Sequence, residues 1–104
     1  MTIEASVYID YCDAISERER VMGNGYSNPI SEVDGFISTV EKAIHTTERA
    51  LERLDSMSDT EERQEDSEEY KRMITEMKGW LLWADRLKDD INDRANEGKK
   101  SSNA

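Results

Sequence analysis

Apolar residues recur at steps of three and four in three segments of this chain, and the middle segment is the most regular. Its apolar or small side chains follow in the order Val33, Ile37, Val40, Ile44, Thr47, Leu51 and Leu54. Others widen the stripe on one flank: Phe36, Ala43, Ala50 and Met57. Successive residues of an α-helix are rotated by about 100°, so this spacing places the series along one side. We therefore predict an amphipathic helix over residues 30–57.

The third segment repeats this rhythm near the carboxyl end. Its seam consists of Tyr70, Met73, Met77, Trp80, Ala84, Leu87 and Ile91, with Ile74 and Leu81 beside it. The two stripes have similar lengths, so they match as the antiparallel arms of a helical hairpin. The pattern predicts a helix over residues 67–94.

The first segment has a broader apolar side. That side contains Ile3, Val7, Tyr8, Tyr11, Ala14, Ile15 and Met22, and Ile9 is the misfit. We predict a helix over residues 3–22. The break that follows it contains Gly23, which can adopt a left-handed stop, and Pro29, which suits the first turn of the next helix.

These elements predict an all-α fold, an antiparallel three-helix bundle in which the first helix covers the open side of the long hairpin. Repeats of this period favour shallow, left-handed crossings. The chain length fits one domain, which we place at residues 1–95. Residues 96–104 are polar and are predicted to form a disordered tail.

An acidic segment, residues 58–69, connects the second and third helices. It has no apolar side chain and holds seven acidic residues against one arginine. A helix starting near Ser58 would place like charges four residues apart, each pair disfavouring helix by roughly 0.2–0.5 kcal/mol. Ser67, followed by two glutamates, offers a second start. We favour a firm helix from Ser67, preceded by a partly helical, frayed segment.

Composition and charge limit the partners. Apolar residues make up 36% and charged residues 37% of the chain, so the core is lean and a homodimer would bury more surface. The formal net charge of −10 disfavours direct binding to nucleic acid or anionic membranes and favours a protein with a basic surface. A single cysteine and the lack of a targeting segment predict a cytoplasmic protein.

Residues with catalytic or metal-binding chemistry are sparse. His45, the only histidine, lies between Glu41 and Glu48 at helical spacing, whereas a di-iron bundle needs Glu-x-x-His on two helices. Cys12 has no partner in the sequence that would activate it as a nucleophile. We therefore predict no enzyme activity, no cofactor and no metal site.

The sequence Gly-Trp-Leu-Leu-Trp near residue 80 suggests a contact surface. Leu82 projects away from the seam, and Trp83 lies at its edge. Either the first helix covers Leu82, or Leu82 and Trp83 bind a partner or a second copy, with Trp83 as an anchor.

The acidic segment has two interpretations as well, a solubilising connection or a mimic of a nucleic-acid phosphate track. The mimic would use Glu61, Glu62, Glu65, Asp66, Glu68 and Glu69. The main functional prediction is a non-enzymatic interaction protein, such as an adaptor, chaperone or structural module. The alternative is a mobile-element-type inhibitor that masks a basic nucleic-acid-binding surface, and the second alternative is a metal-binding or catalytic helical protein. A mimic requires the acids to converge on one accessible surface, whereas an adaptor requires exposed apolar surface.

Overall fold

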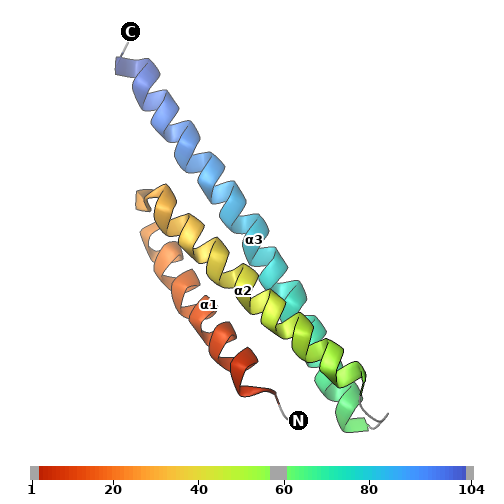
Figure 1. Cartoon of the computed structure of the whole chain (residues 1–104). Coiled ribbons are helices and arrows are strands. Elements are labelled where there is room, and N and C mark those ends of the chain that lie inside the picture. The colour runs from red at the N-terminus through yellow and green to blue at the C-terminus, as the bar shows by residue number, and fades with distance from the viewer. Residues whose placement is uncertain (1–2, 57–60, 103–104) are drawn as a thin grey trace.

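The computed structural model describes residues 3–56 and 61–102, with side chains for residues 3–56 and 64–96. These residues form helix α1 (Ala5–Asn24), the short 3₁₀ turn η1 (Gly25–Ser27), α2 (Ile30–Asp55) and α3 (Glu61–Ser102). In Figure 1, α1 and α3 run in the same direction and α2 runs against both. The predicted all-α fold with its α2–α3 hairpin is confirmed.

The core follows the two predicted seams. In α3 the buried apolar residues are Tyr70, Met73, Ile74, Met77, Trp80, Ala84 and Leu87. In α2 they are Val33, Phe36, Val40, Ala43, Ile44 and Ala50, together with Thr47. The buried side of α2 is shifted toward the flank that contains Phe36, and Ile37, Leu51 and Leu54 are only partly buried. The shift arises because α2 packs against both neighbours, so its buried arc is wider than one seam.

α1 buries much less than α2. Its buried residues are Val7, Ala14 and Val21, which follow one another at seven-residue spacing. The predicted inward side of this helix was too broad, because Tyr8 and Met22 are exposed. Both residues lie to one side of the narrow line that faces the bundle, so packing includes only the centre of the predicted apolar side.

The corner between α1 and α2 is closed by Asn28. Its Nδ2 donates hydrogen bonds to the carbonyl oxygens of Val21 and Gly25, each at 2.7 Å, and the residue is buried. Gly25, rather than Gly23, has a positive φ, of 54°. A residue with a Cβ is strained at this φ, so glycine fits here.

α3 is longer at both ends than the sequence predicted. It begins at Glu61 instead of Ser67, and Asp66 continues the seam four residues before Tyr70 and is 5% exposed. Acidic residues in a first helical turn interact favourably with the helix dipole, which offsets their mutual repulsion. The helix also continues past Arg94 through residues 96–102, part of the segment assigned to a tail. The only proline is Pro29, so no later residue blocks the helix sterically.

The molecule is a rod of 67 × 17 × 15 Å with a radius of gyration of 17.8 Å. α3 extends beyond the corner that joins α1 and α2 (Figure 1). Near that corner, the Arg94 guanidinium lies 3.9 Å from the centroid of the Tyr26 ring. Within residues 3–56 and 61–102, no helix is long and apolar enough to cross a membrane.

Candidate partner-binding surface

The side of α1 that points away from the bundle is apolar over its first two turns. Ala5, Tyr8, Ile9 and Cys12 share this side, which we call the outer α1 face. Tyr8 is 61% exposed and Ile9 is 57% exposed. Single exposed apolar residues are ordinary, whereas a contiguous group at steps of three and four is typical of a helix that packs on both sides.

Aromatic and polar contacts fix the orientation of this face. The Tyr11 ring stacks on Trp80 with centroids 5.7 Å apart, and its hydroxyl donates a hydrogen bond to Oε2 of Glu76 at 2.9 Å. The Glu4 backbone N–H donates to the Tyr70 hydroxyl at 3.1 Å. Because Tyr11 points inward to α3, residues on the opposite side of α1 must point outward.

Side-chain contacts of Tyr11 and Glu4 shift the pKa values of both groups. Burial and the hydrogen bond to Glu76 raise the pKa of Tyr11 above its usual range. The hydrogen bond from Arg53 lowers the pKa of Glu4, and the Arg53 Nε and Glu4 Oε1 atoms are 3.2 Å apart. Both groups connect the amino-terminal part of the chain to a neighbouring helix, Tyr11 to α3 and Glu4 to α2.

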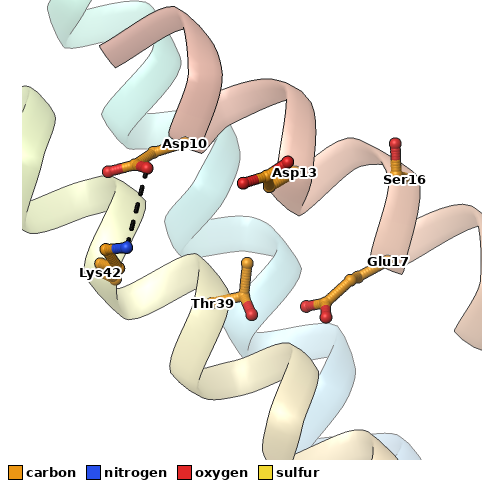
Figure 2. Close-up of a pocket in the computed structure, with 6 residues that line it drawn as sticks. All are labelled: Asp10, Asp13, Ser16, Glu17, Thr39 and Lys42. Atoms are coloured by element: carbon orange, nitrogen blue, oxygen red, sulfur yellow. Dashed lines mark ion pairs between the residues drawn. The ribbon is translucent and has the colours of Figure 1, made fainter. Parts of the chain in front are cut away.

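A hollow of about 270 Å³ lies between α1 and α2, next to the outer α1 face. It is lined by Asp10, Asp13, Ser16 and Glu17 of α1 and by Thr39 and Lys42 of α2 (Figure 2). We call it the acidic hollow because its three carboxylates outnumber its single lysine. Asp13 lies one helical turn after Ile9, so the hollow and the apolar face adjoin.

The carboxylates of the acidic hollow differ in their contacts. Asp10 accepts a hydrogen bond from Thr46 Oγ1 at 2.7 Å and lies 4.0 Å from Lys42 Nζ. Glu17 Oε1 lies 3.8 Å from Arg20, but its Oε2 atom is buried without a hydrogen-bond partner among the described residues. The three carboxylates of the hollow thus have different surroundings, although all three lie beside Lys42 or Thr39 in its lining.

Metal-binding geometry is absent from the part of the chain that the structure describes. No group of three or more His, Cys, Asp or Glu residues is placed there to hold a metal ion. His45 is exposed on α2.

One of the acidic residues proposed as a phosphate mimic, Asp66, does not lie on the accessible surface. Glu65 and Glu68 are exposed, whereas Asp66 is buried on the seam of α3. Glu69 forms an ion pair with Arg72, which lowers the pKa of Glu69. The side chains of Glu61 and Glu62 lie outside the described residues.

Leu82 and Trp83 point in different directions. Trp83 is partly buried and packs edge-on against Phe36, with centroids 6.0 Å apart. Leu82 is 66% exposed, so the expectation that the first helix covers it is wrong. Its neighbours on the helix surface, Lys78, Gly79 and Arg86, are exposed, so Leu82 is an isolated apolar side chain there.

The outer α1 face was not predicted as a site. The available signal was Ile9, which did not fit the inward apolar side and lies with Ala5, Tyr8 and Cys12 on a helical projection. Comparison of the chain with protein-family models, curated proteins and solved structures finds no match. The surface is therefore characterised by its own chemistry.

Proposed function

We propose that this protein is a non-enzymatic helical module that binds another protein through the outer α1 face. The observation that supports this proposal is the exposure of Tyr8 and Ile9 on a helix whose other side already packs in the bundle. Burial of apolar surface releases about 25 cal/mol per Å², so a partner helix on this face would gain binding free energy. Tyrosine is also enriched among the residues that dominate binding interfaces.

A nucleic-acid mimic is a weaker candidate. A phosphate-like track needs regularly spaced carboxylates that remain available to a basic partner. The burial of Asp66 and the ion pair between Glu69 and Arg72 interrupt such a track on α3. The carboxylates of Glu65 and Glu68 are exposed, so their replacement by glutamine tests the mimic.

The test compares what wild-type protein and three variants capture from native lysate, measured by quantitative mass spectrometry. One variant, Glu65→Gln/Glu68→Gln, removes two exposed carboxylates of α3. Tyr8→Gln/Ile9→Gln removes the apolar groups of the outer α1 face, and Leu82→Gln removes an exposed apolar residue elsewhere. Circular dichroism checks that each variant folds.

We expect a defined protein to be retained by wild type and by Leu82→Gln and lost by Tyr8→Gln/Ile9→Gln. Equal recovery on all three, or loss with Leu82→Gln alone, would contradict the proposal. Selective loss with Glu65→Gln/Glu68→Gln would instead favour the mimic.

A further inference from the structure

Resting on the proposed function, we infer that the element bound by the outer α1 face is a basic amphipathic helix of another protein. Its apolar residues cover Tyr8, Ile9 and Cys12, and its lysine or arginine side chains reach the acidic hollow. The inference combines two adjoining features, an exposed apolar helix side and an electronegative recess.

The shape of the apolar surface fits a helix. Ala5, Tyr8, Ile9 and Cys12 are related by steps of three and four, the pattern by which helices present anchors to one another. The face spans about two helical turns, or roughly 11 Å of helix length. A helix laid along α1 would bury this length with one apolar stripe of its own and leave its flanks over the neighbouring polar residues.

The charged residues of α1 indicate which charge the flanks of the partner helix have. Every charged residue from Ile3 to Glu17 is acidic, namely Glu4, Asp10, Asp13 and Glu17. The Asp13 side chain is exposed, and the acidic hollow beside it has three carboxylates against one lysine. A guanidinium or ammonium group donates strong, charge-assisted hydrogen bonds to such oxygens. Acidic side chains on the partner would be repelled at the same positions.

The same charges argue against a second copy of this chain as the occupant. Two outer α1 faces placed together would bring two acidic hollows close to one another, each with three carboxylates against one lysine, on chains that each have a net charge of −10. Like-charge juxtaposition disfavours an interface. A basic helix removes this repulsion and gains attraction instead.

The probe is a fluorescent synthetic peptide of about 18 residues, enough for roughly five helical turns, with leucines on one side and lysines elsewhere. A matched peptide has glutamates in place of the lysines. Binding is measured by fluorescence anisotropy at an ionic strength of about 0.15 M, where exposed charges are screened beyond about 8 Å. We expect the lysine peptide to bind at least about tenfold more tightly than the glutamate peptide.

Two pairs of substitutions in the proposed site and one control pair separate specific docking from general attraction to an acidic protein. Tyr8→Gln/Ile9→Gln and Asp13→Asn/Glu17→Gln should each weaken binding of the lysine peptide by about tenfold. Glu65→Gln/Glu68→Gln removes the same charge from α3 and should change affinity by less than about twofold. Glu17 also contacts Arg20, so the double substitution changes more than the hollow. The single substitution Asp13→Asn is therefore measured as well.

Four results would overturn the inference. Equal weakening by Glu65→Gln/Glu68→Gln would show diffuse attraction, and unchanged binding by Tyr8→Gln/Ile9→Gln would show that the apolar face is not used. A mass twice 12.0 kDa by light scattering, reduced by Tyr8→Gln/Ile9→Gln, would identify a second copy as the occupant. If the peptide fails while lysate capture still depends on Tyr8 and Ile9, the partner class is wrong and the proposed function stands.

Discussion

α1 and α2 lie side by side in the rod, yet they are held by different kinds of contact. α2 buries seven residues, including Phe36 and Val40, on a continuous side. α1 buries only Val7, Ala14 and Val21 and relies on polar and aromatic contacts at its edges. Because apolar burial scales with area, α2 is the more firmly attached helix.

The difference shows how a lean chain can leave a helix available for binding. A helix that packs with small side chains along one narrow line keeps most of its circumference outside the core. In α1 that circumference includes Tyr8 and Ile9. Regions with few buried apolar contacts also open locally at lower free energy than the rest of a fold. The same feature that weakens α1 therefore presents its outer face.

The largest expected effect lies in the α2–α3 core. Phe36 is fully buried and packs against Trp83, so Phe36→Ala should lower the free energy of unfolding by about 3–5 kcal/mol. Leu82→Ala should change it by less than about 0.5 kcal/mol, because Leu82 is exposed. Urea unfolding followed by circular dichroism measures both. A comparable loss at Leu82 would contradict the assignment of the core.

A matched pair of valines tests the comparison directly. Val7 in α1 and Val40 in α2 are both fully buried, and replacement by alanine removes the same two methyl groups. Each change should lower the free energy of unfolding by about 2 kcal/mol.

Amide hydrogen exchange should separate the two valines. Val7→Ala should speed exchange mainly in α1, whereas Val40→Ala should speed it in α2 and α3 together. If both variants speed exchange over all three helices alike, α1 does not open independently and the contrast is lost.

A smaller effect is expected from the hydroxyl of Tyr11. Tyr11→Phe removes its hydrogen bond to Glu76 and should lower the free energy of unfolding by about 1 kcal/mol. The folded pKa of Tyr11 is raised above 10.0, so its contribution is complete below pH 10.0 and is lost as the pH rises through the folded value. The melting temperature in alkaline buffer should therefore fall less steeply with rising pH for Tyr11→Phe than for wild type.

The smallest effect concerns Glu4 at the start of α1. Its pKa is lowered from 4.5 by Arg53, so its stabilising contribution is present above pH 4.5 and is lost as the pH falls through the folded value. Glu4→Gln should remove part of the acid-induced loss of α1 protection in hydrogen exchange. An identical acid profile for wild type and variant would show that the ion pair does not hold α1.

The sequence predicted the buried sides of α2 and α3 well because their apolar residues, apart from Leu82, lie on one side, so periodicity alone identifies that side. α1 has apolar residues on two sides, and periodicity cannot say which of Tyr8 and Val7 faces inward. The early start of α3 escaped prediction for another reason. Repulsion between neighbouring carboxylates is a local penalty of about 1 kcal/mol, which the helix dipole and the burial around Tyr70 can outweigh.

Of the exposed apolar residues, the sequence identified Leu82 as one without a place in the seam, and the structure leaves it exposed outside the proposed site. It could not locate the acidic hollow, because that recess needs the register of α1 on α2. Only packing brings Glu17 of α1 near Thr39 of α2. Asp66 was predicted to be accessible because it lies among other acidic residues in the sequence. Its place on the seam, four residues before Tyr70, is recognised only from its burial.

The rod shape has a hydrodynamic consequence. A compact chain of this length has a radius of gyration of about 13 Å, against 17.8 Å here. An elongated particle experiences more friction than a sphere of equal volume, so a single 12.0 kDa chain should elute from a gel-filtration column ahead of compact proteins of the same mass. Its elution volume would imitate that of a dimer. Sedimentation equilibrium, which does not depend on friction, therefore gives the number of chains in the particle.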